Sequence, residues 1–545
     1  MVTAHETPSL FGAQWRADWR ATLGPAWGVL LAGFLVCLFI GGATMPLWDP
    51  DLPMHLALGE WIVRHRAVPF VEPFAWTRAG EPFFAYSWLM EVLYYGSLRA
   101  LGPLGPHLIQ GLQLALAGVG VLVLGAVARW SGWTTILVLA LHILIGVGVV
   151  PSLRPQGVMV AVGPFTWAFV LLVRDRARIV APLFGLFACA AVAANSHLFF
   201  PMTAAPGVAL LLGKRLDWRR IALAAAAVLV GWMCSPYALH WLDVYRLNFE
   251  PHALYTSPTP VEEYTPGFTA LIHGGGTMLL VVPLLIVLPW LVTTRLTGRE
   301  RAAYGLLWFA GLVAFGIAVR GVLPWWLLSM PAVAVALGVL VSPTTPLVLT
   351  TQRTVVAAIF GAVAAFGGGV SGDPWLAAGT VETRYLPSTA ASGIEPIARW
   401  LDCHLAPAAR GRLLTIFNYG SYVAWRLPHL SQSIDGRTIF PDSAARAETY
   451  LLPVRRTLPL PPWRSADLAI VPVPYPVAAV LDTATGWRRV AMTADRDGPA
   501  TMIGLWVKES WWANAGSEGL PSRQLLLMHT PPDATRGCAG RRATS

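Results

Sequence analysis

Long apolar runs recur along this chain, and they constrain its fold more than any other feature. They lie at about 27 to 47, 106 to 128, 133 to 150, 157 to 173, 179 to 195, 199 to 213, 221 to 235, 269 to 293, 303 to 319, 322 to 341 and 353 to 370. A perpendicular helix needs about 20 apolar residues to cross a bilayer, and most runs approach that length. Only 12% of the residues are charged, which is typical of multispanning proteins. The sequence therefore predicts a mainly α-helical, polytopic membrane protein with about eleven transmembrane helices.

Arginine placement predicts which loops face the cytoplasm. The formal net charge of +10 comes almost wholly from arginine, since Lys214 and Lys508 are the only lysines. Alternating crossings from a cytoplasmic N-terminus place basic loops near 129, 174 to 178, 214 to 220, 295 to 301 and 353 in the cytoplasm. Cytoplasmic loops carry an excess of Lys and Arg, so this agreement supports the topology. Charge gathered in short loops does not suit a phosphate-binding face, and we expect no nucleic-acid partner.

The same topology sets the expected domains. They are a cytoplasmic N-terminus at 1–26, a multispanning membrane domain at 27–370 with a periplasmic first loop at 48–105, a periplasmic α/β domain at 371–512, and a disordered tail at 513–545. The first apolar run follows Arg16 and Arg20 and lacks a small-residue cleavage site, which favours an anchor over a cleaved signal peptide. Arginine-rich, lysine-poor usage is compatible with a GC-rich bacterium. The expected location is the bacterial inner (plasma) membrane.

The more polar C-terminal part is predicted to form a small α/β domain. Its expected elements are a helix near 394 to 405 and strands near 413 to 417, 467 to 471, 488 to 492 and 501 to 507. Cys403 and Cys538 can pair there only if this domain faces an oxidising compartment. The other cysteines fall inside apolar runs.

The loop that follows the first apolar run is rich in polar residues and proline. Asp49 and Asp51 flank Pro50, and Asp51 is a good N-cap for a helix. If a helix starts there, His55 lies one turn on and faces Asp51. Taken singly, the two aspartates also fit a helix cap and a solvated loop residue, and His55 fits an interfacial histidine. Together they place two carboxylates and an imidazole at one edge of the membrane.

Other unusual polar residues of the membrane portion also fall on the predicted non-cytoplasmic side. They are Glu91, Arg154, Asn195, His197, Glu262, Glu263 and Arg320. Arg154 and Arg320 can snorkel from tight turns, and Glu262 and Glu263 suit an ordinary loop surface. Charges near bilayer depth are nevertheless costly unless they pair or line a wet cavity, so residues delivered by separate hairpins favour a shared site. His142, deep inside a run, is interpreted as packing.

Transfer of a sugar from a lipid phosphate needs groups of these kinds. A carboxylate takes the proton of the acceptor, and cations or a metal stabilise the departing phosphate. Asp49 or Asp51 can be the base, or this pair with His55 can hold a divalent metal ion. Arg154 and Arg320 can bind phosphate oxygens bidentately. A transporter would favour broken helices, charges at mid-bilayer and inverted repeats, none of which is evident in the sequence.

The chain resembles a bacterial group of multispanning proteins of the glycosyltransferase-C type. The first-loop residues that carry this resemblance are Asp49-Pro50-Asp51-Leu52, His55, Gly59, Trp61-Ile62, Pro69, Pro73-Phe74, Thr77, Gly80, Pro82, Trp88-Leu89 and Glu91. Further matches are Arg154-Pro155-Gln156, Asn195, His197, Pro236-Tyr237, Glu262-Glu263-Tyr264-Thr265-Pro266, Arg320, Pro324, Asn418-Tyr419-Gly420-Ser421-Tyr422 and Asp435-Gly436-Arg437. The group is similar to the dolichyl-phosphate-mannose protein mannosyltransferases and the lipid A aminoarabinose transferases. It tends to have a His-Glu pair where this chain has Tyr86-Ser87.

The resemblance implies a catalytic aspartate in the first external loop, a polyprenyl-phosphate sugar donor and a periplasmic active site. The predicted function is transfer of a sugar from that donor to a glycan, lipid or protein acceptor outside the cytoplasm. Asp49, Asp51 and His55 are the catalytic candidates, Asp49 and Asp51 the metal candidates, and the seven polar residues listed above the substrate-binding candidates. The candidates for acceptor contacts in the C-terminal part are Asn418, Asp435 and Arg437. The alternative is that Asp435 and Arg437 brace a turn by a salt bridge. The alternatives are a lipid or polysaccharide transporter and a non-catalytic envelope-assembly protein on the same fold.

Overall fold

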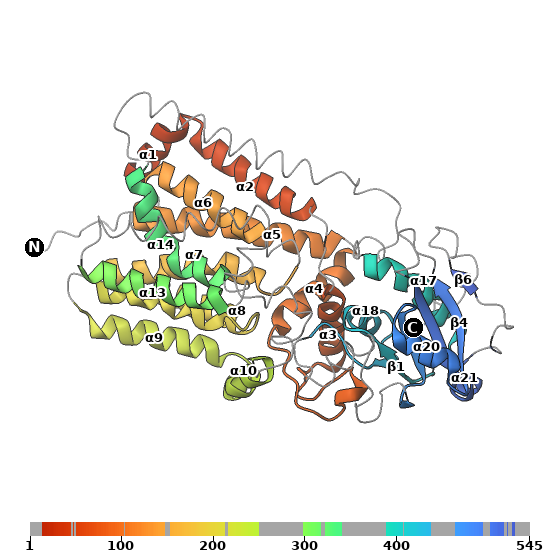
Figure 1. Cartoon of the computed structure of the whole chain (residues 1–545). Helices are drawn as coiled ribbons and strands as arrows, with labels where there is room; N and C mark the ends of the chain where they lie inside the picture. Colours follow the sequence, from red (N-terminus) through yellow and green to blue (C-terminus); the bar gives the residue numbers. More distant parts are fainter. Residues whose placement is uncertain are drawn as a thin grey trace, which may run out of the picture. The chain divides into compact units, whose positions relative to one another are not determined.

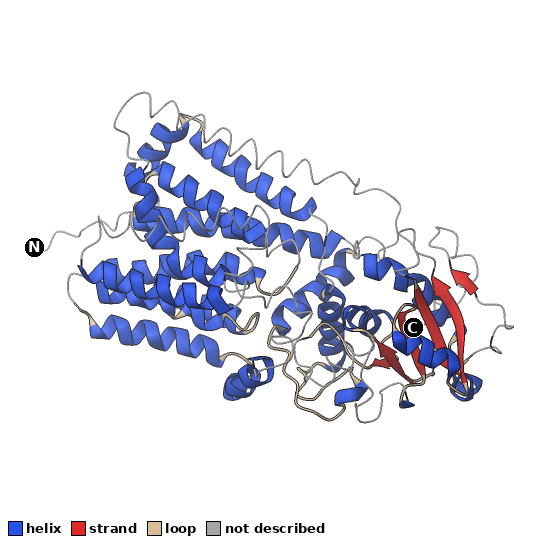
Figure 2. Cartoon of the chain, in the orientation of Figure 1, coloured by secondary structure: helices blue, strands red, loops and turns tan. Residues whose placement is uncertain are grey.

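The chain divides into two compact units in this computed structural model. The structure describes residues 13–44, 47, 51–102, 104–147, 153–212, 216–249, 298–317, 322–340, 389–406, 408–437, 464–493, 502–516, 520 and 526–528. The helical unit consists of Met1–Met45, Leu104–Leu242 and Thr259–Ala377. The loop–tail unit consists of Pro46–Pro103, Asp243–Pro258 and Ala378–Ser545. The described strands all belong to the loop–tail unit (Figures 1 and 2).

The helical unit is built from helices, most of which are apolar. They are α1 (Ala13–Leu23), α2 (Trp27–Thr44), α5 (Leu104–Ala128), α6 (Gly132–Val147), α7 (Gly157–Asp175), α8 (Val180–Ala194), η3 (Phe200–Thr203), η4 (Ala205–Leu212), α9 (Trp218–Met233), η5 (Ala238–His240), α13 (Gly298–Ile317) and α14 (Val322–Leu340). Helix α10 (Trp241–Phe249) begins at the end of this unit. Helix α5 packs against α2, α6 and α7. A Cβ on Gly111 of α5 would lie 2.5 Å from the carbonyl oxygen of Phe39 in α2, so small residues let these helices approach closely.

Three described helices, α2, α5 and α7, are long and apolar enough to cross a membrane. A bent pair, Trp218–Met233 with Ala238–Asn248, would make a fourth span. Of the eleven predicted apolar runs, those at 269 to 293 and 353 to 370 lie outside the described residues, and the others coincide with helical elements. The run at 199 to 213 forms 3₁₀-helices instead of the expected α-helix. Pro201 and Pro206 lie in these two segments, and proline cannot donate the hydrogen bonds of an α-helix interior.

His142 has the packing role that its position in an apolar run predicts. Its imidazole is fully buried in α6. The indole Nε1 of Trp326 donates to its Nδ1 over 2.8 Å, which leaves Nε2 to donate to the carbonyl oxygen of Val160 over 2.9 Å. Both ring nitrogens are thus satisfied in a neutral tautomer that joins α6 to α7 and α14.

The loop–tail unit combines helices of the first loop with a six-stranded sheet from the C-terminal part. Its helices are α3 (Leu52–His65), η1 (Trp76–Arg78), α4 (Trp88–Leu101), most of α10, α17 (Thr389–His404), α18 (Phe417–Arg426), α20 (Pro476–Thr483) and α21 (Glu509–Ala515). Its strands are β1 (Gly411–Thr415), β2 (Leu430–Gln432), β3 (Leu468–Pro472), β4 (Trp487–Thr493), β5 (Ile503–Lys508) and β6 (Leu526–Met528). Strand β6 lies within the 513–545 stretch for which composition predicts disorder.

The strands run in the order β2-β1-β3-β5-β4-β6. Strand β1 is parallel to β2 and β3, β5 is antiparallel to β3 and β4, and β6 is parallel to β4. Every residue of β3 and all but the last of β5 are buried, as the continuous apolar sequences of these two strands predict. Helix α17 packs against β4 and β5, and α20 packs against β3 and β4. The predicted helix and the four predicted strands correspond to α17, β1, β3, β4 and β5.

The first loop packs directly on the C-terminal part of the chain. Met54 and Leu58 of α3 share a buried cluster with Ala424 of α18 and with Ile434. At the sheet edge, Ala75 forms a parallel bridge with Gln432 of β2. The hydroxyl of Thr77 donates to the carbonyl oxygen of Ser433 over 2.5 Å, and that of Ser431 donates to the carbonyl oxygen of Phe74 over 2.5 Å. Segments more than 300 residues apart in sequence therefore form one core.

Truncating Ile434 tests this shared core. The Ile434 side chain is 4% exposed, so the Ile434→Ala variant should lower the free energy of unfolding by about 2–5 kcal/mol. Val480 on α20 is 40% exposed, and Val480→Ala should change stability by less than about 0.5 kcal/mol. Chemical unfolding of the detergent-solubilised protein measures both values. Equal effects in the two variants would contradict the described packing.

Candidate functional site

Asp51 stands at the N-terminus of α3, as the sequence predicts, but its side chain does not cap the helix. Its backbone has φ −87° and ψ −14°, a helical conformation, and the carboxylate makes no capping hydrogen bond. A capping side chain usually requires an extended backbone, which turns it back toward the first helical amides. The Asp51 carbonyl oxygen instead accepts hydrogen bonds from the amides of Met54 and His55. The expected capping role is therefore wrong.

The Asp51 carboxylate lies against the backbone of Gly436. A Cβ built on Gly436 would be 2.0 Å from Oδ1 and 3.2 Å from Cγ of Asp51. The amide of Gly436 donates to the hydroxyl of Ser421 over 3.1 Å, and Ser421 belongs to the first half of α18. The C-terminal part of the chain thus supplies one wall beside the predicted catalytic aspartate.

His55 and Glu91 meet between α3 and α4. Nδ1 of His55 lies 3.4 Å from Oε1 of Glu91, and the Glu91 side chain is only 2% exposed. The hydroxyl of Ser87 donates to the same Oε1 over 2.7 Å. A Cβ on Gly59 would lie 2.1 Å from the carbonyl oxygen of Glu91, so this glycine allows the two helices to approach. Oε2 of Glu91 is buried and has no hydrogen-bond partner among the described residues.

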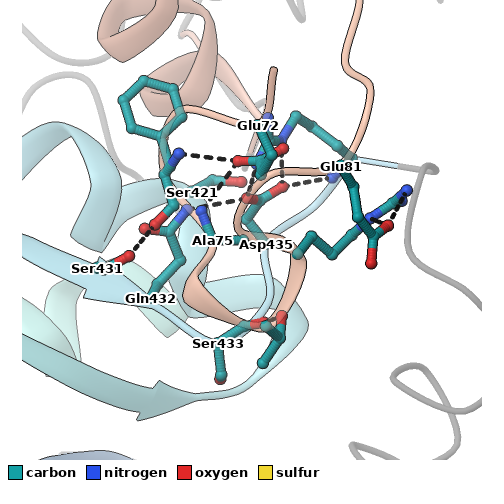
Figure 3. Close-up of polar contacts among 12 residues, drawn as sticks. Glu72, Ala75, Glu81, Ser421, Ser431, Gln432, Ser433 and Asp435 are labelled. Carbon is teal, nitrogen blue, oxygen red and sulfur yellow. Dashed lines mark hydrogen bonds and ion pairs between the residues drawn. The ribbon is translucent and has the colours of Figure 1, made fainter.

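A buried ion network, which the sequence analysis anticipated only in part, lies beside this site (Figure 3). Arg437 donates through Nε to Oδ1 of Asp435 over 2.7 Å, and through Nη2 to Oδ2 over 2.6 Å. The same Nη2 donates to Oε1 of Glu72 over 2.7 Å. The pairing of Asp435 with Arg437 confirms the interpretation that they brace a turn. Glu72, the partner from the first loop, was missed, because a lone glutamate beside a proline resembles loop surface.

Charge and aromatic contacts stabilise Arg437. Although burial alone would lower its pKa, the carboxylates of Asp435 and Glu72 outweigh that effect and raise the pKa of Arg437 above its usual value. The guanidinium also lies over the rings of Phe83 and Phe74, with its Cζ 4.8 Å and 5.6 Å from the ring centroids. Glu72 accepts the backbone amides of Phe74 and Ala75 at 2.9 Å each. The network therefore fixes both the first loop and the turn at 435–437.

Three further candidates lie in the helical unit. Arg154 is half-buried immediately before α7, where the amide of Gly157 donates to its carbonyl oxygen. Asn195 ends α8, and its side-chain amide donates to the carbonyl oxygen of Ala191 over 2.8 Å. His197 follows, and its Nδ1 accepts the amide of Phe199 over 3.1 Å. Because α7 and α8 pack together and are joined by a short connection, these residues lie at the same end of that helix pair.

The remaining candidates Asp49, Glu262, Glu263 and Arg320 lie outside the described residues. Within the described part of the chain, no group of three His, Cys, Asp or Glu side chains is placed to hold a metal ion. Asp51, His55 and Glu91 do not form such a set, and Oε1 of Glu91 is already an acceptor for Ser87. The described residues alone thus do not fit a metal centre.

Solved structures that share this fold include ArnT, an archaeal oligosaccharyltransferase and an arabinofuranosyltransferase. ArnT from Cupriavidus metallidurans in the apo state matches with a TM-score of 0.53 and 15% identity, over 89% of this chain and 98% of ArnT. The Archaeoglobus fulgidus oligosaccharyltransferase matches with a TM-score of 0.55 and 11% identity, over 82% of this chain and 69% of that enzyme. Mycobacterial arabinofuranosyltransferase AftD matches with a TM-score of 0.51 and 14% identity, over 88% of this chain and 41% of AftD.

These similarities define the fold class. The chain has the glycosyltransferase-C type fold and is a membrane protein, as the apolar runs and first-loop residues predict. Its similarity to ArnT extends over nearly the whole ArnT chain. A comparison with protein-family models found no match, and neither did one with curated proteins.

Removing the Ser87 hydroxyl tests the buried state of Glu91. Ser87→Ala deletes a charge-assisted hydrogen bond to a desolvated carboxylate and should lower the free energy of unfolding by about 1.5–3 kcal/mol. Ser97 is a matched control on the same helix, because its hydroxyl donates only to the carbonyl oxygen of Tyr94. Ser97→Ala should change stability by less than about 0.5 kcal/mol. A Ser87→Ala variant as stable as the wild type in chemical unfolding would contradict the hydrogen bond from Ser87 to the buried Glu91 side chain.

Proposed function

We propose that this protein transfers a glycosyl unit from a polyprenyl-phosphate carrier to an acceptor hydroxyl or amine on the non-cytoplasmic face of the membrane. The observation that carries the proposal is the Asp51 carboxylate, which stands at a helix N-terminus without capping it. The fold adds support, because ArnT was also solved bound to undecaprenyl phosphate and the archaeal oligosaccharyltransferase AglB with dolichol phosphate and an inhibitory peptide.

In the proposed reaction, Asp51 is the general base. The acceptor oxygen or nitrogen attacks the anomeric carbon, the bond from that carbon to the phosphate oxygen breaks, and the electron pair leaves with the polyprenyl phosphate. The acceptor's proton passes to the Asp51 carboxylate, which lowers the barrier for attack.

His55 and Glu91 form the second part of the proposed machinery. The contact between His55 Nδ1 and Glu91 Oε1 orients the imidazole one turn after Asp51. With Nδ1–H directed at the Glu91 carboxylate, the Nε2 of this imidazole can accept a hydrogen bond from a hydroxyl of the sugar or the acceptor. Arg154, Asn195 and His197 are proposed to bind phosphate or sugar, on the chemistry of their side chains. Asp49, Glu262, Glu263 and Arg320 stay candidates from the sequence.

A disulfide supports the proposed location of the C-terminal part. Cys403 at the end of α17 is disulfide-bonded, while its expected partner Cys538 lies outside the described residues. Disulfides persist in oxidising compartments such as the bacterial periplasm and are rare in the cytosol. This observation agrees with the arginine distribution, which places the first loop and the C-terminal part on the non-cytoplasmic side.

Release of radiolabelled sugar from polyprenyl-phosphate donors by the purified full-length protein tests the proposal. A panel of hexose and pentose donors, with envelope extract as acceptor, should give transfer by the wild type. Asp51→Asn should reduce turnover by about 10²–10⁴-fold, since it removes a general base while keeping the side-chain volume.

Glu60 provides a matched control on the same helix. It pairs with the exposed Arg64 at 2.5 Å, so Glu60→Gln should leave turnover within about twofold of the wild type. Equal turnover by Asp51→Asn and the wild type would remove Asp51 from the mechanism. Failure of the wild type with every donor would contradict the transferase function itself.

A further inference from the structure

The turn Asp435-Gly436-Arg437 is held from three directions by described contacts. Arg437 is anchored to Glu72 of the first loop, as shown above. The Asp435 carboxylate also accepts the side-chain amide of Gln432 over 3.0 Å, and Asp435 is fully buried. On the side of α18, a Cβ on Gly420 would lie 1.7 Å from the carbonyl oxygen of Ile434, so helix and turn are in direct backbone contact. The turn therefore has little freedom to move away from its neighbours.

Space, and not backbone conformation, is what requires glycine at position 436. Gly436 is not among the glycines with positive φ, which are Gly24, Gly80, Gly102 and Gly486. An L-residue could therefore adopt its backbone angles. A side chain there would instead collide with Oδ1 of Asp51, 2.0 Å from the Cβ position, and with the hydroxyl oxygen of Ser421 at 3.0 Å. The Asp51 carboxylate occupies the volume that a side chain at 436 would fill.

We propose that the turn Asp435-Gly436-Arg437 is a positioning element for the Asp51 carboxylate, an inference that rests on the proposed function of Asp51. The position of a general base matters, because a misplaced carboxylate transfers protons poorly. The rigid backbone of Gly436 closes one side of its space. The hydrogen bond from the Gly436 amide to Ser421 holds that backbone against α18, and the Arg437–Glu72 ion pair ties it to the loop that carries Asp51.

The proposal assigns a role to the C-terminal part of the chain. Its residues 433–437 do not touch the acceptor in this account. They act through Asp51, and they set where its oxygen atoms lie when the acceptor arrives. Glu72 and Arg437 contribute by holding the turn, and Gly436 contributes by leaving room for the carboxylate.

Gly436→Ala tests this role. The added methyl group should displace the carboxylate, so kcat should fall at least tenfold while the KM for the polyprenyl-phosphate donor changes less than twofold. Ser421→Ala removes the acceptor for the Gly436 amide without adding volume, and it should lower kcat by a smaller factor. Gly96→Ala in α4 is the matched control, because nothing lies within 4 Å of its Cβ position, and it should keep wild-type kinetics. Unchanged kcat in Gly436→Ala would overturn the proposal.

A cross-link provides a readout that does not need activity. In a background with Cys37, Cys189 and Cys234 replaced by alanine, the pair Asp51→Cys and Gly436→Cys should form a disulfide under mild oxidation, detected as a linked peptide by mass spectrometry. The Cβ position at 436 lies 3.2 Å from Cγ of Asp51, which is compatible with disulfide geometry. The control pair Asp51→Cys with Gly96→Cys should not cross-link.

The kinetic measurements and the cross-link together distinguish the transferase function from the positioning role of the turn. A cross-link in a protein whose wild type transfers no sugar would keep the described geometry and overturn the transferase function. Active wild type without a cross-link, or with a fully active Gly436→Ala variant, would keep the function and overturn the positioning role.

Discussion

A buried ion network holds together the part of the molecule that contains Asp51. Arg437 contacts two carboxylates. One belongs to Glu72 in the first loop, and the other belongs to Asp435, two residues before Arg437 in the sequence. Desolvating three charged groups is costly, and only good geometry with further hydrogen bonds repays that cost. Glu72 meets this condition through the amides of Phe74 and Ala75, and Asp435 meets it through Gln432. The network therefore contributes more to specifying one arrangement of loop and turn than to net stability.

This arrangement has consequences for function. The C-terminal part of the chain completes the core of the first loop, because Met54 and Leu58 of α3 share a buried cluster with Ala424 of α18 and with Ile434. Once the loop is seated, the N-terminus of α3 brings Asp51 against Gly436, and α4 brings Glu91 against His55. The proposed base and its neighbours are thus placed by packing that spans more than 380 residues of sequence, as the contact of residue 51 with residue 436 requires.

Much of the fold could be predicted from the sequence, because its signals are local. Apolar runs predicted the helices, and short apolar segments predicted β1, β3, β4 and β5. The membrane topology that the basic loops favour stays a prediction. The elements missed include β2, which has three residues, and α18, which follows β1 after a single residue. In the run at 199 to 213, prolines converted an expected α-helix into 3₁₀ segments. The count of eleven spans and the proposed domain boundaries stay predictions.

The candidate site was harder to predict, because its contacts are non-local. Helix spacing placed His55 one turn after Asp51, but no pattern could show that Glu91 would be the partner of His55 or that Ser87 would donate to it. The N-cap rule failed at Asp51, where the helical backbone leaves the carboxylate free of capping. Gly436 shows the limit most clearly. Position 436 requires glycine because the Asp51 side chain, 385 positions earlier in the sequence, fills the space beside it. Only the structure places the two residues together.

The most direct test of this account is a double-mutant cycle on Glu72→Gln and Arg437→Met, with the free energy of unfolding measured in detergent for all four proteins. Arg437→Met leaves the buried carboxylates of Glu72 and Asp435 without their counterion and should cost about 3–5 kcal/mol. Glu72→Gln leaves Arg437 paired with Asp435 and should cost less. The double variant should cost less than the sum of the two by at least about 1 kcal/mol, because the removed groups interact. Additive effects within about 0.5 kcal/mol would show that the two residues do not interact, and would contradict the claim that this ion pair seats the first loop on the C-terminal part of the chain.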